Sequence, residues 1–351
     1  MTTSIEQARG SNGVGVPAVG QMFQGGVQAD KVQSTVDNYE AKFEKSGDER
    51  RAAAVEVARD YYQLVTDFFE YGWGQSFHFA PLKKTESFKE SIKLHEQKLA
   101  LRLGLKPGMR VLDAGCGVGG PMRAIASISG ARVTGVTISP YQIQRIRTLN
   151  EKAGLSHLCE GVEADFNKLP FSPGTFDAAY EIEACCHAAD RRGPFGEIFR
   201  TLKPGALFAG YDWVMTERYI PGNAEHERVK LGVEKGNGLP PMVKSQELDA
   251  CLKDVGFEIL ETRDMRHDGD ADMPWYTPLD SGVSLQGFRN SRAGAFATHQ
   301  LVRMLERARI APKGTLQMHG VLRLAQQSLV EAGKMDIFTP MYFWVARKPA
   351  K

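Results

Sequence analysis

The chain has 351 residues, of which 42% are hydrophobic, and its 44 Lys and Arg nearly balance its 42 Asp and Glu to give a net charge of +2. Such a balance provides no basic field for gripping phosphates, so we expect no nucleic-acid partner. The 5 cysteines include no C-x-x-C pair, which indicates free thiols in a reducing, intracellular compartment and implies neither disulfides nor zinc. The sequence shows no signal peptide and no apolar run of the ~18 residues that a spanning helix needs.

The first part of the chain predicts a tail followed by two helices. Residues 1–38 are rich in Gly, Gln, Ser, Thr and Val without periodicity, which favours a disordered tail. Apolar residues then recur at steps of three and four, which predicts an amphipathic helix over Arg51–Glu70 and a second one over Ser87–Leu103. We expect residues 39–105 to form an N-terminal helical cap.

Strands and helices alternate from Arg110 onward. The expected strands are Arg110–Ala114, Arg132–Thr137, His157–Ala164, Phe176–Ile182, Ala206–Val214 and Phe257–Arg263, and the expected helices are Pro121–Ser129, Pro140–Ala153, Pro194–Leu202 and Gln246–Val255. This alternation predicts an α/β fold with a Rossmann-like, doubly wound and mostly parallel sheet over residues 106–265. Residues 266–351 form an expected C-terminal α+β region with helices at Ala295–Arg309 and Leu316–Ala332 and a strand at Met341–Ala346.

The segment Arg110-Val-Leu-Asp-Ala-Gly-Cys-Gly-Val-Gly-Gly120 joins the first of these strands to a helix. Gly115, Gly117 and Gly119 allow a tight turn that a ligand can approach closely, and Asp113 places a carboxylate at the junction. A strand-to-helix turn with no ligand remains the alternative. We favour a nucleotide-bearing cofactor, because the carboxylate and the whole strand–turn–helix context accompany the glycines.

Ligands of such sheets lie beyond the carboxyl ends of the strands, so residues there are candidates for cofactor binding. Thr137, Ser139 and Gln142 follow the second strand and could hydrogen-bond a ribose, although Ser139 also suits a simple helix start. Asp165 and Phe166 follow the third strand and suit an adenine, since the carboxylate accepts from its amine beside a ring; a loop Asp that caps a turn is the alternative.

Two further features concern the reaction. The fourth strand ends in Tyr180-Glu-Ile-Glu-Ala-Cys-Cys-His187, where Glu181, Glu183 and His187 could hold an amino group or take up a proton. His187 could equally be a structural histidine. Aromatic residues are dense at Tyr71–Phe79, at Trp275 and Tyr276, and at Tyr342–Trp344. They either pack as ordinary core or line an apolar cavity whose ring faces stabilise a carbocation.

These motifs together resemble the sterol 24-C-methyltransferases, whose S-adenosylmethionine-binding domain has the class I methyltransferase fold. The resemblance covers residues 61–348 and rests on these segments: Tyr71-Gly-Trp-Gly-Gln-Ser-Phe-His-Phe79, Leu112–Pro121, Glu183-Ala-Cys-Cys-His187, Gly236-Asn-Gly-Leu-Pro240, Pro274-Trp-Tyr-Thr-Pro278 and Phe338-Thr-Pro-Met-Tyr-Phe343. The glycine motif is shared by most S-adenosylmethionine methyltransferases. The first and last segments are specific to the family.

The resemblance implies transfer of a methyl group from S-adenosylmethionine, without a metal, to the side-chain double bond of a sterol precursor such as cycloartenol, lanosterol or zymosterol. It assigns the cofactor to Asp113, Gly115, Gly117, Gly119, Thr137, Gln142, Asp165, Phe166 and Glu181. It assigns the substrate to Glu70, Trp73, Phe77, His78, Trp275 and Tyr276, and catalysis to Glu183, His187 and Tyr71. A location in the cytoplasm or peripherally on the endoplasmic reticulum membrane fits this role, and a homo-oligomer is compatible with it.

Two other functions remain open at this point. A methyltransferase acting on a linear triterpene such as squalene would share these motifs. A lipid-binding relative without activity is disfavoured, because a competent residue fills every expected cofactor position. A dinucleotide dehydrogenase is disfavoured because it has no use for Asp165, Phe166 and the aromatic segments.

Overall fold

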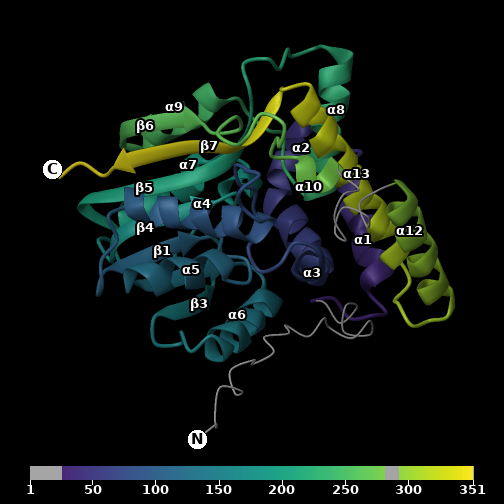
Figure 1. Cartoon of the computed structure of the whole chain (residues 1–351), viewed down its shortest axis with the longest axis horizontal. Helices are drawn as coiled ribbons and strands as arrows, with labels where there is room; N and C mark the ends of the chain where they lie inside the picture. The colour runs from purple at the N-terminus through teal and green to yellow at the C-terminus, as the bar shows by residue number, and fades with distance from the viewer. Residues whose placement is uncertain (1–25, 281–291, 351) are drawn as a thin grey trace, which may run out of the picture.

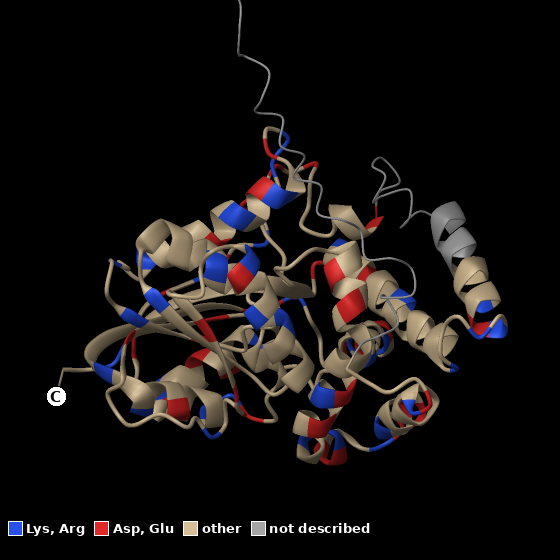
Figure 2. Cartoon of the chain, turned by 90° about the horizontal axis from the view of Figure 1, so that it is seen from below, with Lys and Arg blue, Asp and Glu red and all other residues tan. Residues whose placement is uncertain are grey.

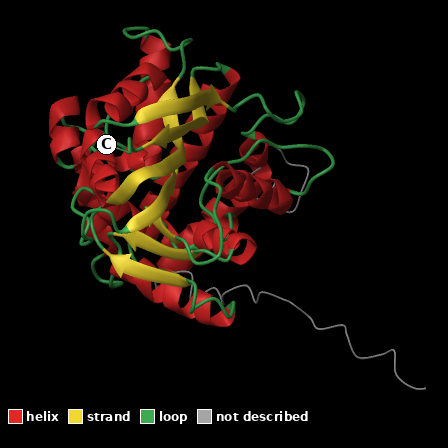
Figure 3. Cartoon of the chain, turned by 90° about the vertical axis from the view of Figure 1, so that its left-hand side faces the viewer, coloured by secondary structure: helices red, strands yellow, loops and turns green. Residues whose placement is uncertain are grey.

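The computed structural model describes residues 26–280 and 292–350, with side chains described from residue 299 in the second part. A 7-stranded sheet in the order β3-β2-β1-β4-β5-β7-β6 forms its centre, with helices on both faces (Figures 1 and 3). Strands β1 to β5 are parallel, and β7 runs antiparallel between β5 and β6. The expected Rossmann-like α/β class is confirmed.

The sheet is buried on both faces, which explains the apolar runs of its strands. The strands are β1 (Arg110–Ala114), β2 (Arg132–Thr137), β3 (Cys159–Glu163), β4 (Phe176–Ile182), β5 (Leu202–Met215), β6 (Glu258–Asp264) and β7 (Phe338–Arg347). Successive residues of a strand point to opposite faces, so Val111 and Leu112 belong to two separate hydrophobic clusters. The first cluster contains residues of α4 (Phe88–Arg102), α5 (Gly120–Ser129) and α6 (Pro140–Lys152), and the second contains residues of α7 (Arg192–Thr201) and α9 (Ser245–Val255).

A second group of helices gathers beside the sheet (Figure 1). These helices are α1 (Val32–Lys42), α2 (Gly47–Ala52), α3 (Ala54–Gly72), α8 (Ala224–Asn237), α10 (Thr277–Asp280), α12 (Arg292–Arg307) and α13 (Thr315–Lys334). We call this group the helical cap. It combines segments from the start, the middle and the end of the chain. Among the described residues, no helix has the length and apolar character to cross a membrane.

The expectation of a disordered tail through residue 38 is wrong for residues 32–38, which belong to α1. Val32, Val36 and Tyr39 are buried on one face of this helix, and the Tyr39 ring stacks on Tyr61 with centroids 5.9 Å apart. Their spacing of four and three residues is helical, although the residues between them are polar. Residues 1–25 of the expected tail lie outside the described residues.

Three other expectations need correction. β7 pairs with both β5 and β6, so a domain boundary at residue 265 would cut a single sheet. The helix expected over Arg51–Glu70 is divided between α2 and α3 at Ala53. Helix α8 was not predicted at all. It packs closely against α13, since Gly232 and Gly236 face Ser328 and Ala325 so tightly that a Cβ on either glycine would overlap its partner.

Candidate functional site

The glycine turn after β1 forms the floor of a cavity. Gly115, Gly117 and Gly119 have φ angles of 92°, 52° and 79°, a region that side chains other than glycine rarely adopt. A Cβ on Gly115 would also overlap the side chain of Ala184. Beside the turn, the hydroxyl of Tyr180 donates a hydrogen bond of 2.9 Å to Asp113, whose burial raises the pKa of this carboxyl to about 7.

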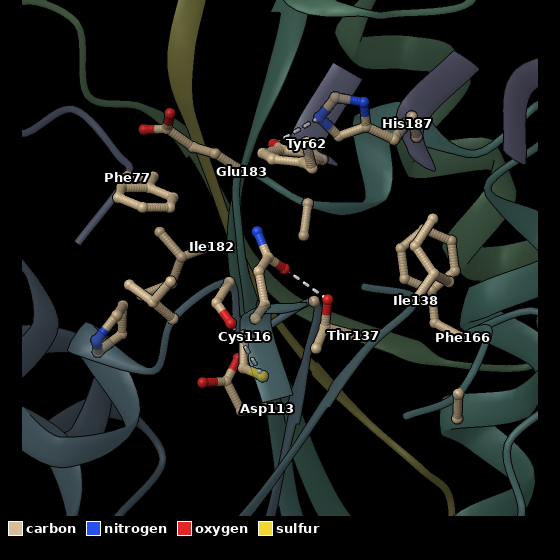
Figure 4. A pocket seen from close by; sticks show the side chains of 18 of the residues that line it. Tyr62, Phe77, Asp113, Cys116, Thr137, Ile138, Phe166, Ile182, Glu183 and His187 are labelled. Carbon is tan, nitrogen blue, oxygen red and sulfur yellow. Dashed lines mark hydrogen bonds between the residues drawn. The ribbon is translucent and has the colours of Figure 1, made fainter. Parts of the chain in front are cut away.

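Residues from four strand ends surround this cavity (Figure 4). The hydroxyl of Thr137 donates to Oε1 of Gln142 over 2.6 Å, which fixes both side chains at the end of β2. After β3, Oδ1 of Asp165 accepts from the backbone N–H and the side-chain amide of Asn167, each over 2.8 Å. Phe166, between Asp165 and Asn167 in the sequence, is part of the cavity wall. The site thus offers carboxylate, hydroxyl and amide groups together with an aromatic ring.

Seven of the nine residues expected to bind the cofactor line this cavity: Asp113, Gly115, Gly117, Thr137, Gln142, Asp165 and Phe166. Gly119 does not line it but is the N-cap residue of α5. Glu181 does not line it either. Its Oε2 accepts from the backbone N–H groups of Ala184 and Cys185, and burial raises the pKa of its carboxyl. Glu181 therefore holds the turn after β4 rather than facing a ligand.

Helix α3 supplies lining residues that the sequence reasoning did not assign to the cofactor. Val55, Ala58 and Tyr62 lie on the cavity wall opposite the strand ends. They are among the apolar positions whose periodicity predicted the helix. The periodicity predicts that this face of α3 is buried, but it does not show whether protein or a ligand covers it, because core packing and ligand contact give the same pattern.

A second, larger cavity of about 400 Å³ lies within the helical cap. Most of its lining is apolar, and it includes Trp73, Phe77 and His78, which were expected to bind the substrate, and Tyr71, which was expected to be catalytic. The other expected substrate residues lie elsewhere. Glu70 forms a two-pronged ion pair with Arg145, with N···O distances of 2.7 and 2.9 Å.

Trp275 and Tyr276 do not line this apolar cavity either. The ring of Trp275 packs edge-on against Phe79 with centroids 5.0 Å apart. Tyr276 lies so close to Gly333 that a Cβ on the glycine would overlap its ring. Both side chains therefore support the cavity wall from behind.

The two cavities share five lining residues, namely Tyr62, Phe77, His78, Glu183 and His187. Glu183 directly follows β4 and has a φ angle of 53°, an uncommon conformation for a residue with a side chain. Its Oε1 accepts from the backbone N–H of Phe79 and its Oε2 from Nε1–H of Trp213, each over 2.7 Å. Burial raises the pKa of Glu183 to about 8.

His187 is held by two hydrogen bonds, as Figure 4 shows in part. Its Nδ1 lies 3.1 Å from the carbonyl oxygen of Gly238 and its Nε2 lies 2.9 Å from the hydroxyl of Tyr62. A carbonyl only accepts, so Nδ1 carries the proton and Nε2 accepts from Tyr62. Burial lowers the pKa of His187 to about 4, which keeps the ring neutral. The lone pair on Nε2 is thus already engaged by the hydroxyl of Tyr62.

His78 lies on the other side of Glu183. Its Nε2 lies 3.2 Å from Oε1 of Glu96. Burial alone would lower the pKa of His78, but the hydrogen bond and the charge of Glu96 outweigh burial and raise it. A cation at His78 would favour the ionised form of Glu183. Among the described residues, no group of three or more His, Cys, Asp or Glu could hold a metal ion.

Comparison with known proteins shows the family to which this chain belongs. A family model described as "Methyltransferase domain" matches residues 112–210, and one described as "Sterol methyltransferase C-terminal" matches residues 285–350. Cycloartenol-C-24-methyltransferase 1 of Oryza sativa is 48% identical over 329 residues, which are 93% of this chain and 95% of that protein. The chain belongs to the sterol 24-C-methyltransferase family. It is a methyltransferase with S-adenosylmethionine as its methyl donor.

Other relatives and solved structures agree with this family. Sterol 24-C-methyltransferase of Saccharomyces cerevisiae is 41% identical over 331 residues, which are 92% of this chain and 86% of that protein. The crystal structure of the mycolic acid cyclopropane synthase CmaA1, complexed with SAH and CTAB, is similar in fold with a TM-score of 0.64 at 16% identity. The match covers 84% of this chain and 98% of that one. The sterol methyltransferase thus shares its fold with methyltransferases of distant sequence.

Proposed function

We propose that this enzyme transfers a methyl group from S-adenosylmethionine to the side-chain double bond of a sterol precursor of the cycloartenol, lanosterol or zymosterol type, as a step of sterol biosynthesis. The observation that carries the proposal is the meeting of the cavity at the strand ends, which holds several polar groups, with the apolar cavity at Glu183. The names of the relatives, which include cycloartenol-C-24-methyltransferases and sterol 24-C-methyltransferases, support this substrate class.

The cavity at the strand ends fits the methyl donor. S-adenosylmethionine supplies an electrophilic methyl group on a sulfonium, and this chemistry needs no metal. The backbone at Gly115 and Gly117 comes close to the cavity without side chains. Thr137 and Gln142 would hydrogen-bond a ribose, and Asp165 would accept from the adenine amine beside the ring of Phe166. Asp113 would place its carboxylate near the positively charged end of the cofactor.

The apolar cavity fits the alkene and the cation that follows. The alkene's electron pair forms the new carbon–carbon bond while the methyl–sulfur bond breaks, and that pair stays on sulfur. A tertiary cation results, a hydride shift relocates the charge, and loss of a proton restores a double bond. Ring faces of Trp73 and Phe77 on the cavity wall would stabilise the cation, and exclusion of water would protect it from capture.

Glu183 is the proposed acceptor of that proton. It lines both cavities, and each oxygen receives one hydrogen bond from the protein, which leaves lone pairs for the substrate. A base whose pKa lies near the working pH is well matched to proton transfer. His187 is the weaker candidate, because Tyr62 already occupies its Nε2. Tyr71 lines the apolar cavity and is proposed to contact the substrate rather than to take up a proton.

The proposal is tested by incubating the purified enzyme with methyl-labelled S-adenosylmethionine and cycloartenol, lanosterol, zymosterol or squalene in parallel. We expect label in at least one sterol and none in squalene. Labelling of squalene alone would overturn the sterol assignment. The Glu183→Gln variant serves as the matched control, because it should bind both reactants and turn over slowly.

We further propose that the enzyme associates peripherally with membranes through α12. Leu301 and Met304 of α12 and Ile310 just after it are exposed, and Leu301 also lines the apolar cavity. The same segment contains the basic residues Arg303, Arg307, Arg309 and Lys313 together with Glu306, and Figure 2 shows basic and acidic residues at the end of this helix. An exposed apolar face with basic neighbours suits an anionic lipid surface. A membrane at this position would present its sterols beside the cavity.

A further inference from the structure

The apolar cavity has two ends of different character. Helix α13 runs along it and contributes Leu329, Gln326, Leu322 and His319 to its wall. Leu329 belongs to the same hydrophobic cluster as Trp213, whose indole donates to Glu183. His319 precedes Leu329 by ten residues, which places it about 15 Å farther along the helix axis. This distance is comparable with the length of a sterol from its ring hydroxyl to its side-chain alkene.

Two polar atoms of the cavity wall lack partners. Nδ1 of His319 and the hydroxyl of Tyr61 are both buried without a hydrogen-bond partner among the described residues. Both side chains line the cavity, and Tyr61 is only 1% exposed and shares a hydrophobic cluster with Met318. A buried polar group without a hydrogen bond is destabilising. Two such groups in one apolar cavity indicate a ligand that supplies the missing hydrogen bonds.

Several other polar side chains of the cavity are engaged with the protein, whereas Arg323, one turn after His319, adds a positive charge to the wall. Asn237 donates to the carbonyl of Val233 over 2.8 Å, and Gln326 donates to the carbonyl of Leu279 over 2.6 Å. Tyr62 and His187 bond to each other. Burial lowers the pKa of His319 to about 4, so its ring is neutral and offers one donor and one acceptor. A hydroxyl group has the same pair of functions and is the natural complement.

We propose that His319, with the hydroxyl of Tyr61, binds the ring hydroxyl of the sterol and thereby decides which end of the substrate reaches the methyl donor. This inference rests on the proposed function. A sterol has a single polar group, at the end opposite to its side chain. An otherwise apolar cavity with hydrogen-bonding groups at its far end accepts this molecule in one orientation, which places the alkene beside Glu183. His319 and Tyr61 are therefore positioning residues.

The test compares the best sterol substrate with its 3-deoxy analogue, in the native enzyme and in four variants. Native enzyme should favour the hydroxylated sterol about tenfold or more in kcat/KM, because the analogue leaves buried polar groups unpaired. His319→Leu should lose most of this preference, mainly through a higher KM with kcat nearly kept. Tyr61→Phe, which removes only the hydroxyl, should weaken the preference, whereas His319→Gln should retain part of it.

His299→Leu is the matched control. The His299 ring lies 5.7 Å from that of His319 on the neighbouring helix, but His299 is absent from the cavity wall, so this variant should discriminate like the native enzyme. Equal rates of native enzyme on both sterols would overturn the inference, as would unchanged discrimination in both His319→Leu and Tyr61→Phe. Either result leaves sterol methylation standing. Absence of methylation on every sterol would instead refute the proposed function.

Discussion

Glu183 combines burial, an uncommon backbone angle and two hydrogen bonds, and this combination predicts the pH dependence of the reaction. Its pKa is raised to about 8 by burial, and only the ionised carboxylate accepts a proton. Turnover at saturating substrates should therefore rise from pH 6 and level off above about pH 8. Glu183→Gln should lower kcat by roughly a hundredfold or more and remove this rise. Initial rates between pH 6 and 9 measure both effects.

Stability should depend on pH in the opposite sense. The folded-state pKa of Glu183 lies above the ordinary value of 4.5, so the folded enzyme holds this proton where the unfolded chain has released it. The contribution of the group to stability is complete below pH 4.5 and declines as pH rises to about 8.

For the rate prediction, a profile of turnover that stays flat from pH 6 to 9 in the native enzyme would show that Glu183 is not the base.

Asp113 predicts a separate effect on cofactor binding. Asp113→Asn removes a buried charge from the cofactor cavity while its side chain keeps the shape that Tyr180 contacts. We expect S-adenosylhomocysteine to bind about tenfold to a hundredfold more weakly, since hydrogen bonds to charged groups contribute about 1.5–3 kcal/mol. Isothermal calorimetry measures this change.

Glu70→Gln is the control for Asp113→Asn. It removes a carboxylate of the helical cap that pairs with Arg145 and lines neither cavity. Affinity for S-adenosylhomocysteine should be unchanged in this variant. Equal losses in the two variants would mean that the charge of Asp113 has no specific role in binding.

The carboxylates of the site show how far the sequence could predict it. Asp113 lies near the end of β1 and Asp165 follows β3, and the ends of parallel strands meet at one edge of the sheet, so their convergence was predictable. The ion pair of Glu70 joins residues 75 positions apart, and no local pattern indicates it. Glu181 and Glu183 were indistinguishable, because β4 is buried on both faces. Only the backbone turn at Glu183 separates a carboxylate facing the cavities from one facing the loop.

At the scale of elements, the prediction succeeded where local signals were strong. The bounds of β1, β2 and β4 agree with the sequence-based expectation, because glycine or proline adjoins each short apolar run, namely Gly115 after β1, Pro140 after β2 and Gly174 before β4. Helix α8 was missed because charged residues and two glycines interrupt its pattern, and its stability comes from packing on α13. Helix α1 was missed because its apolar residues are few, although their spacing is helical.

Two glycine-to-alanine substitutions should change the free energy of unfolding in opposite directions, one of them where α8 packs closely on α13. Gly236→Ala places a methyl group against the backbone of Ala325, so we expect a loss of about 1–3 kcal/mol in the free energy of unfolding. Gly196→Ala, within α7, meets no atom within 4 Å and should gain about 0.5–1 kcal/mol. Thermal or urea unfolding measures both. A stable Gly236→Ala variant would mean that the two helices separate easily.

At the scale of the whole molecule, the two cavities come from two parts of the chain with different roles. The sheet supplies the strand ends that form the proposed cofactor cavity. The helical cap supplies the apolar cavity and also closes the cofactor cavity through α3. On the proposed function, substrate choice would reside in α3, α8, α12 and α13, whereas methyl-donor binding would reside mainly in β1 to β4 and the turns that follow them.

Membrane association is the last prediction, and it follows from the position of α12 on the outside of the cap. The enzyme should float with vesicles that contain anionic lipid and should be released from them as salt is raised, because salt screens the attraction between basic side chains and anionic lipid.

Met304→Asp places a negative charge on the proposed membrane contact and should reduce flotation severalfold. Ile220→Asp is matched to it, since Ile220 is 58% exposed and Met304 60%, but Ile220 lies outside α12 and should float like the native enzyme. Equal flotation of the two variants would locate the membrane contact elsewhere. Unchanged activity of Met304→Asp on detergent-dispersed sterol, with lower activity on vesicle-borne sterol, would show that α12 serves delivery of the substrate and not its conversion.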